Sequence, residues 1–429
     1  MSQGAAAVVA GVRTPFVKAW TALDGVAARE LARLVIREIV DRADLSPKEV
    51  DEVILGCVSQ PAEAVNVARV AALEAGIPRS VPAYTVARNC ASGLQALTSA
   101  CEKIQTGQAS CLIAGGVESM SNVPLQFSKA AQRKFMALGR AKIFSQKFAA
   151  VFSFRPKDLL SPVEALRCCL TDPVSGLGMG ETAELLAKEL KISREEQDAF
   201  ALESHRRAAR AWDEGRFRDE VMTLYPAPSH DAVSFDTGIR RDQTPEALAK
   251  LEPVFDRKFG TVTAGNSSQV SDGAAALLVM REDKARALGY RPLGFVRAYA
   301  YAGCDPARMG LGPVFVVQKL LKQTGVRLAD VELVELNEAF AAQAIACERV
   351  SSSASLAKRY GLDGAPGELN RERLNPKGGA IALGHPVGAS GARLVLTLAL
   401  EMKRRRRALG LAALCVGGGQ GGALLLERK

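Results

Sequence analysis

The chain has 429 residues, of which 48% are hydrophobic and 24% are charged, so it is long enough to form two or more globular lobes. Its nine cysteines are an odd number without a Cys-x-x-Cys pair, and it has only three histidines, which disfavours a disulfide framework and a structural zinc site. The net charge of +10 favours anionic ligands, such as a phosphate-bearing cofactor. Because no apolar run reaches 18 residues and no secretory signal is recognisable, we expect a cytoplasmic protein that spans no membrane.

The predicted helices and strands are those of an α/β fold, and their order in the first half of the chain is repeated in the second half. An amphipathic helix over 30–42 leads through an acidic link to a buried strand over 50–56, and the same order appears at 316–336. Apolar strands that end in glycines match at 110–116 and 412–418. Helix starts match at Cys90-Ala91-Ser92-Gly93 and Gly388-Ala389-Ser390-Gly391. These correspondences predict a duplicated α/β lobe with largely parallel sheets covered by helices.

We place the N-terminal lobe at residues 1–282 and the C-terminal lobe at 289–429. A mostly helical insertion at about 121–262 interrupts the first lobe and is expected to cover the active site. Within it, residues 129–157 combine eight basic residues with interspersed phenylalanines. Such a segment fits an anionic membrane surface, although a partner-subunit contact and a solvated helix are the alternatives. The basic cluster at 403–407 ends a helix and lacks any nucleic-acid motif, so we predict no nucleic-acid partner.

Cys90 sits between an extended stretch at 83–87 and a run with helical spacing at 93–105. The free N–H groups at a helix start favour thiolate over thiol, which would lower the pKa of Cys90 as a nucleophile requires. On this stretch alone, a buried structural cysteine is an equally good interpretation.

Three further motifs carry residue types suited to chemistry. Asn337 follows the strand of the second lobe, at the end where open α/β sheets bind ligands. His385 lies in a glycine-rich loop before a helix, where a base has access to a ligand. Cys415 precedes a glycine run whose N–H groups could form an oxyanion hole. The repeat places all of these near the lobe junction, and two cysteines with one histidine suit an acyl transfer.

Together these motifs resemble those of the thiolase family over nearly the whole chain, from Arg13-Thr14-Pro15-Phe16 to Gly422. The resemblance rests on Cys90-Ala91-Ser92-Gly93, Asn337-Glu338-Ala339-Phe340, Gly384-His385-Pro386 and Cys415-Val416-Gly417. It implies an α/β fold of five layers, α-β-α-β-α, with the insertion as the loop domain. It also implies thiolytic cleavage of 3-ketoacyl-CoA, or the reverse condensation, with coenzyme A and acyl-CoA as substrates and with no metal or resident cofactor.

The resemblance further implies a role for each matching residue. Cys90 would carry the acyl group, His385 would activate it, and Cys415 would act as the acid and base. Asn337 would hold a water that, with His385, forms one oxyanion hole, and the N–H groups of Cys90 and Gly417 would form the other. Ser268 would contact the CoA pantetheine, and Met179 and Phe340 would line the acyl pocket.

The substrate prediction rests on two stretches that resemble the β-subunit of the fatty-acid oxidation complex, at 171–184 and 255–263. That subgroup often has histidine where this chain has Asn337. We therefore favour a broad or long-chain 3-ketoacyl-CoA thiolase, with an acetyl-CoA C-acetyltransferase specific for acetoacetyl-CoA as the alternative. A decarboxylating synthase of the same fold would lack Cys415, and a non-catalytic lipid-binding scaffold would not need both cysteines and His385. The family also suggests a homodimer or homotetramer and a hydratase/dehydrogenase partner subunit.

Overall fold

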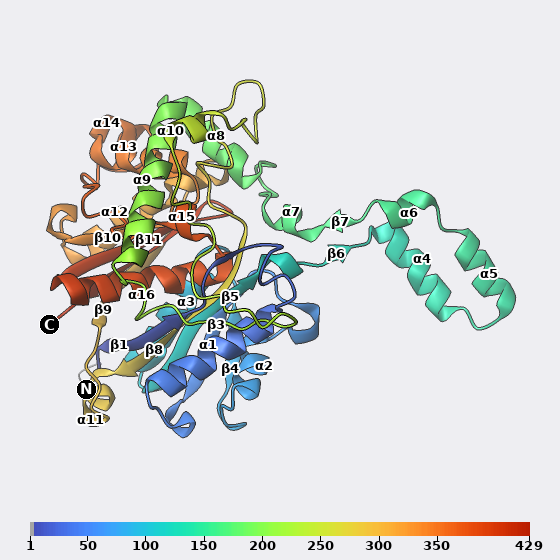
Figure 1. The fold of residues 1–429 in the computed structure, drawn as a ribbon, viewed down its shortest axis with the longest axis horizontal. Coiled ribbons are helices and arrows are strands. Elements are labelled where there is room, and N and C mark those ends of the chain that lie inside the picture. Colours follow the sequence, from blue (N-terminus) through green and yellow to red (C-terminus); the bar gives the residue numbers. More distant parts are fainter. Residues whose placement is uncertain (1–3) are drawn as a thin grey trace. The chain divides into compact units, whose positions relative to one another are not determined.

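The computed structural model describes residues 4–429, which divide into two compact units. The larger unit holds residues 4–122 and 172–429, and the smaller one holds 123–171. The larger unit is built on a sheet of ten strands in the order β10-β11-β12-β9-β1-β8-β5-β3-β4, with β2 paired to β8 (Figure 1). The strands are β1 (Ala6–Arg13), β2 (Val17–Lys18), β3 (Glu52–Gly56), β4 (Ala83–Val86), β5 (Cys111–Ser119), β8 (Ser271–Arg281), β9 (Gly294–Gly303), β10 (Leu333–Leu336), β11 (Leu409–Val416) and β12 (Gln420–Glu427).

The sheet has one half from each predicted lobe, joined where β1 pairs with β9 through Ala7–Phe295 and Val8–Gly294. The parallel strand pairs are β3–β4 and β3–β5 in the first half, and β10–β11 in the second. The remaining pairs, including β1–β8, β5–β8, β11–β12 and β9–β12, are antiparallel. The prediction of largely parallel sheets is therefore wrong. The glycine turn after Val416 sends β12 back along β11, and the long β8 returns from the insertion against β1 and β5.

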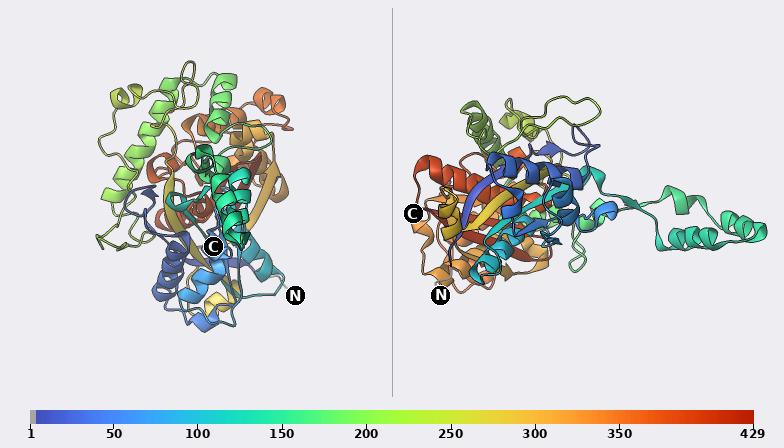
Figure 2. Two further views of the ribbon diagram at one scale, coloured as in Figure 1. Left: turned by 90° about the vertical axis from the view of Figure 1, so that its right-hand side faces the viewer. Right: turned by 90° about the horizontal axis from the view of Figure 1, so that it is seen from below.

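Helices fill three layers around the two half-sheets. Two helices, α3 (Ser92–Gln105) and α16 (Val387–Arg405), pack against each other and against strands of both halves. Their apolar residues and the facing sides of the strands form one buried cluster. Outside the first half lie α1 (Ala28–Arg42), α2 (Val67–Glu74) and α11 (Glu282–Ala287), and outside the second lie α8 (Met179–Leu190), α12 (Gly312–Thr324) and α13 (Ala341–Ser352). The order α-β-α-β-α is visible in Figures 1 and 2 and confirms the predicted fold class.

Several further helices and 3₁₀ turns complete the larger unit. The longest is α9 (Arg194–Asp213), which Ser193 caps at its N-terminus by accepting from Glu196 N–H at 3.2 Å. The short ones are α10 (Pro245–Ala249), α14 (Ala354–Arg359) and α15 (Ala380–Leu383), with 3₁₀ turns at Pro47–Glu49, Ala62–Ala64, Met120–Asn122, Pro306–Leu311 and Leu328–Asp330. Among the described residues, no helix is both long and apolar enough to cross a bilayer.

The smaller unit is a helical hairpin on a short ribbon. The ribbon pairs β6 (Leu125–Gln126) with β7 (Val163–Glu164), and the helices are α4 (Lys129–Arg140), α5 (Phe144–Phe152), α6 (Pro156–Leu160) and α7 (Ala165–Cys169). Phe135 stacks between Phe127 and Phe154, with ring centroids 4.8 Å apart in both pairs. Lys134 and the buried Asp158 form an ion pair at 2.6 Å. These contacts give the hairpin a small interior of its own.

Candidate active site

The loop that carries Cys90 is fixed from both halves of the larger unit. Asn89 takes a left-handed backbone conformation with φ of 43°, and its side-chain amide donates to the Gly417 carbonyl at 2.7 Å. Ser92 accepts from Arg88 N–H at 2.8 Å and donates to the Asn89 carbonyl at 2.7 Å. Cys90 therefore has a defined place immediately before the first turn of α3.

The Cys90 thiol is half-buried and accepts hydrogen bonds from two backbone N–H groups, its own and that of Gly417. Burial raises the pKa of the thiol, and the negative charge of Glu118 adds to the increase, whereas the two N–H groups lower it. The net direction is upward, so the expectation of a lowered pKa from the helix start alone is wrong for the free protein. Desolvation at this depth outweighs the two donors.

His385 lies at the start of α16 with its ring buried. Its Nδ1 is 2.6 Å from the hydroxyl of Ser390, and that hydroxyl donates to the Pro386 carbonyl at 2.9 Å. Since the single hydroxyl proton is used there, Ser390 accepts from Nδ1–H, and Nε2 keeps its lone pair. Burial, together with the positive charge of Arg393, lowers the pKa of His385 to about 3, so the ring is neutral at physiological pH.

Asn337 faces the free nitrogen of His385. Its Nδ2 is 3.4 Å from His385 Nε2, which suits an amide donor opposite a lone pair. Its backbone N–H donates to the Ala413 carbonyl at 2.9 Å, which holds the end of β10 against β11. The side-chain oxygen of Asn337 is buried without a hydrogen-bond partner in the described chain. An acceptor left in this state is costly unless a ligand group uses it.

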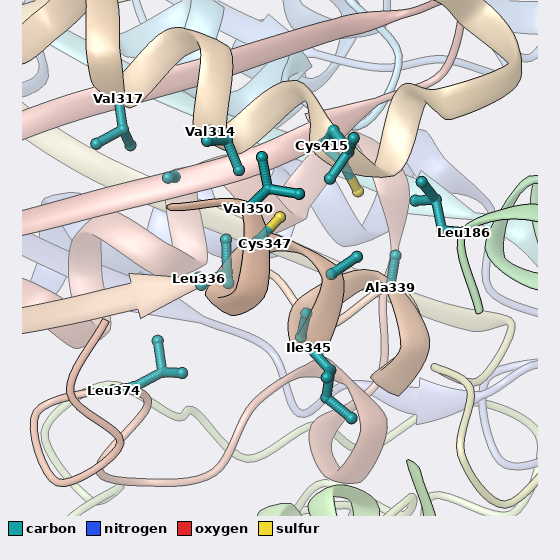
Figure 3. Close-up of a cluster of buried hydrophobic side chains, with 14 of the residues drawn as sticks. Leu186, Val314, Val317, Leu336, Ala339, Ile345, Cys347, Val350, Leu374 and Cys415 are labelled. Atoms are coloured by element: carbon teal, nitrogen blue, oxygen red, sulfur yellow. The ribbon is translucent and has the colours of Figure 1, made fainter. Parts of the chain in front are cut away.

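Cys415 and Gly417 lie at the end of β11. Cys415 is fully buried at the edge of the hydrophobic cluster that also holds Cys347, Leu336 and Ala339 (Figure 3). Burial raises the pKa of Cys415 well above its ordinary value, and the nearby Cys90 contributes to the increase. The two sulfur atoms are thus within electrostatic reach of one another. Gly417 begins a turn in which Gly418 and Gly419 have φ of 86° and 73°.

The start of α16 approaches α3 and β5 through glycines, Gly93 on α3 and Gly116 on β5. A β-carbon built on Gly93 would lie 2.8 Å from the Gly388 carbonyl oxygen, and one on Gly116 would lie 1.9 Å from it. The buried carboxylate of Glu118 accepts from the Gly388 N–H at 3.0 Å and from Val58 and Ser59 N–H at 3.1 and 2.8 Å. Burial raises the pKa of Glu118 to about 7. This packing brings the Cys90 and His385 loops to the same junction.

The three predicted substrate-binding residues occupy different surroundings. Met179 begins α8 half-buried, and its sulfur would be 3.4 Å from a β-carbon placed on Gly417. Phe340 is buried and meets Phe255 edge to face, with ring centroids 6.0 Å apart. Ser268 is half-buried, and its N–H donates to the Ala339 carbonyl at 2.9 Å. Met179 therefore lies close to the turn that follows β11, and Phe340 lies in the loop that carries Asn337.

Sequence reasoning missed three residues that hold the site. Asn89 and Ser390 fix the Cys90 loop and the His385 ring, and Glu118 holds the first turn of α16. The repeated Ala-Ser-Gly at both helix starts was a signal for Ser390, because Ser92 occupies the matching position and bonds the backbone of its own loop. Nothing in the sequence pairs Glu118 with Gly388, which lies 270 residues away.

Comparison with known proteins agrees with this arrangement. Residues 6–283 match the family described as Thiolase, N-terminal domain, and residues 290–428 match Thiolase, C-terminal domain. The chain belongs to the thiolase family. As a thiolase it is an acyltransferase. Among residues 4–429, no group of three or more His, Cys, Asp or Glu side chains is arranged to hold a metal ion.

Individual thiolases match over nearly their full length. A 3-ketoacyl-CoA thiolase of Yersinia enterocolitica is 42% identical over 98% of this chain and 96% of that protein. The structure of human mitochondrial 3-ketoacyl-CoA thiolase superposes with a TM-score of 0.86 at 36% identity, covering 100% of both chains. The Bacillus anthracis acetyl-CoA acetyltransferase structure gives a TM-score of 0.86 at 39% identity, covering 99% of both chains.

Proposed function

We propose that this thiolase cleaves 3-ketoacyl-CoA with coenzyme A, giving acetyl-CoA and an acyl-CoA shortened by two carbons. The proposal rests on the thiol of Cys90, which two N–H groups contact, at a junction shared with a neutral imidazole and a second thiol. The relatives named 3-ketoacyl-CoA thiolase support the same substrate class, and the human enzyme has been solved with CoA.

In the first half-reaction, His385 Nε2 takes the proton of Cys90, and the sulfur attacks the 3-keto carbon. The thiolate that forms stabilises the imidazolium by its opposite charge, which offsets the low pKa of the ring in the free protein. The N–H groups of Cys90 and Gly417 then hold the tetrahedral oxyanion. The C2–C3 bond breaks, and Cys415 gives its proton to the acetyl-CoA enolate that leaves.

In the second half-reaction, the Cys415 thiolate takes the proton of the incoming CoA thiol. The CoA sulfur attacks the acyl group on Cys90, the Cys90 thiolate leaves, and His385 returns the proton. We assign Asn337 to the second oxyanion hole, where its unpaired oxygen would accept from a water that, with His385, donates to the enolate oxygen. Met179 and Phe340 would contact the acyl group, and Ser268 the pantetheine.

Purified protein should convert 3-ketohexadecanoyl-CoA and CoA to acetyl-CoA and tetradecanoyl-CoA, measured by chromatography of the CoA esters. Mass spectrometry of protein quenched during turnover should find the acyl group on Cys90. Alkylation of Cys90 with iodoacetamide that leaves the rate unchanged would rule this mechanism out. The likeness to the Bacillus acetyltransferase supports a second candidate, an enzyme specific for acetoacetyl-CoA. A higher kcat/KM on acetoacetyl-CoA than on the long substrate would favour that candidate.

We also propose that the smaller unit contacts an anionic lipid surface. Phe144, Phe148 and Phe152 recur every fourth residue along α5, and their side chains are 82%, 54% and 70% exposed. Basic residues at 140, 142 and 147 flank them. Exposed aromatic rings with flanking cations suit the boundary between headgroups and acyl chains.

Vesicle co-sedimentation tests this lipid contact. The protein should sediment with phosphatidylcholine vesicles that contain cardiolipin and remain in solution with phosphatidylcholine alone. A Phe144→Ser/Phe148→Ser/Phe152→Ser variant should lose the binding and keep thiolysis of a soluble short substrate. No difference between the two lipid compositions at low salt would contradict the contact and leave a partner subunit as the occupant of this face.

For assembly we propose a homodimer or homotetramer, with a hydratase/dehydrogenase subunit as a further partner that supplies the 3-ketoacyl-CoA. The half-buried strand β4 lies at the edge of the sheet just before the Cys90 loop, and a second copy would cover it. Light scattering after size exclusion measures the state. We place the protein in the cytoplasm, because nine cysteines, an odd number without a Cys-x-x-Cys pair, fit a reducing compartment.

A further inference from the structure

The helix that follows His385 carries a row of buried polar residues. Ser390, Arg393, Thr397 and Glu401 succeed one another at spacings of three, four and four, so they share one face of α16. Their exposed fractions are 0, 0, 0 and 1%. Ser390 holds the imidazole, and the mechanism above uses none of the other three. A buried row of this kind needs a physical reason, because polar groups are costly to bury.

Arg393 joins this helix to the strand that leads to Asn337. Its Nη1 donates to Glu335 Oε2 on β10 at 3.0 Å, and both side chains are at most 1% exposed. Glu335 precedes Asn337 by two residues, so the two leave the extended backbone on the same side of the sheet. The ion pair therefore ties together the two elements whose ends carry His385 and Asn337, which approach each other to 3.4 Å.

The pair is not explained by stability. Arg393 Nε and Nη2 and Glu335 Oε1 are buried without partners within the described part of the chain. Burial opposes the charge of both groups, because it raises the pKa of Glu335 and lowers that of Arg393. Apolar residues of similar volume stabilise such a position as well as an ion pair or better. A role for this pair at the site is therefore a better explanation than stability.

The other buried charged groups around Arg393 have ion-pair or hydrogen-bond partners of their own. Arg13 pairs with Asp236 at 2.6 Å and Glu220 at 2.9 Å, and Lys377 pairs with Glu220 at 2.7 Å. Glu338, also buried, accepts from Ser204 and Asn375, each at 2.7 Å. The positive charge of Arg393 acts on the His385 ring, where it adds to burial in disfavouring the imidazolium.

We propose that Arg393 is a positioning residue for thiolysis. Through Glu335 it fixes the distance between Asn337 and His385, and its positive charge adds to the effect of burial on the imidazole. This role deepens the proposed function and rests on it, although the state of the imidazole can be measured without any substrate.

The test compares Arg393→Met/Glu335→Leu with the parent protein. The double change removes both charges and fills the space with apolar groups, so the fold is expected to persist. We expect kcat to fall on the order of 10²-fold, because the site loses its geometry, with little change in KM. Arg404→Met is the matched control, since Arg404 lies on the same helix, pairs with Glu401 at 2.8 Å and is 47% exposed. It should keep the parental kcat.

The direct readout is the imidazole itself. The chain has three histidines, so ¹⁵N-histidine NMR with His205→Asn and His230→Asn variants assigns the His385 signals. The parent should show one neutral tautomer, protonated at Nδ1, from pH 6 to 8. The double variant should show a mixture of tautomers in that range, because Asn337 would no longer be held opposite Nε2. An unchanged tautomer together with a parental kcat would overturn the proposal.

Arg393→Lys keeps the inference testable if the double variant does not fold. Lysine keeps the charge and loses the planar guanidinium, so the His385 signals should match the parent while kcat falls about tenfold. A His385 signal disturbed in Arg393→Lys as much as in Arg393→Met would show a general loss of structure and contradict a specific charge effect. Absence of thiolysis in the parent protein would refute the proposed function, and the NMR comparison would still decide the role of Arg393.

Discussion

The starts of α3 and α16 are two versions of one loop. Both carry Ala-Ser-Gly, and in both the serine hydroxyl donates to a backbone carbonyl of its own loop, Asn89 in one and Pro386 in the other. The difference is in the residue presented. One loop holds a half-buried thiol against two N–H groups, and the other holds a buried imidazole against the serine. The comparison teaches that one backbone device, used twice, presents the proposed nucleophile from one half and its proposed base from the other.

The largest effect is expected from removing the thiol. Cys90→Ala should lower kcat by about 10⁶-fold, as in enzymes that lose their nucleophile, because no acyl group can be held. Chromatography of the CoA esters measures the residual rate, and circular dichroism confirms folding. Cys101→Ala is a suitable control, since Cys101 is buried on the same helix away from the loop. A Cys90→Ala protein within tenfold of the parent would assign the chemistry elsewhere.

Removing the base from the other loop comes next. His385→Ala should reduce kcat by about 10²–10⁴-fold, the usual contribution of a general base. Alkylation of Cys90 by iodoacetamide at pH 7 should also slow, because no group accepts the thiol proton. If His385→Ala alkylated at the parental rate, the imidazole would not act on Cys90 in the free protein.

Substituting the serine that both loops contain, Ser92 or Ser390, should have a smaller effect on kcat. Ser390→Ala removes the acceptor that fixes Nδ1–H, a hydrogen bond worth about 0.5–1.5 kcal/mol, so kcat should fall about 3- to 10-fold. Ser92→Ala loosens the Cys90 loop and is expected to act mainly on thermal stability. Measuring kcat and Tm for both variants separates the two roles, and equal losses of kcat would mean that Ser390 is merely a loop anchor.

The smallest effect concerns the pH dependence of the thiol. Because the pKa of Cys90 is raised, the thiolate fraction is small at pH 7, and the alkylation rate should climb with a midpoint above the ordinary value of 9.0. Glu118→Gln removes a negative charge that contributes to this increase, so the midpoint should move down and alkylation at pH 8 should quicken a few-fold. A midpoint that moved upward in Glu118→Gln would contradict the sign of this interaction.

Local spacing predicted the elements well and their pairing less well. The helix expected at 93–105 is α3, and the strand expected at 412–418 overlaps β11. The strand directions failed because β8 and β12 return antiparallel, and no short-range pattern encodes which neighbour a strand will take. The fold class and family followed from motifs that the chain keeps intact. The roles of the individual site residues and the domain limits at 282 and 289 stay predictions.

The sequence indicated candidate site residues by their chemical type. It did not indicate their pKa values or their hydrogen-bond partners, which depend on the surrounding structure. Cys90, His385 and Cys415 were proposed from residue type and glycine context, and their roles stay predictions. The direction of the Cys90 pKa was missed because burial depends on β12 and α16, which are distant in sequence. Ser390 and Glu118 were missed because their partners are a ring five residues back and an N–H 270 residues on.

The glycines of α3 and β5 that α16 packs against limit how this enzyme can evolve. At Gly116 and Gly93, even one added methyl group would meet the backbone of Gly388 at 1.9 and 2.8 Å. Such a group would wedge the halves apart and lengthen the path a proton must travel between sulfur and imidazole. Gly93 and Gly116 should therefore tolerate substitution as poorly as the reactive residues. In a saturation library selected for growth, variants at these two glycines should be depleted to the same extent.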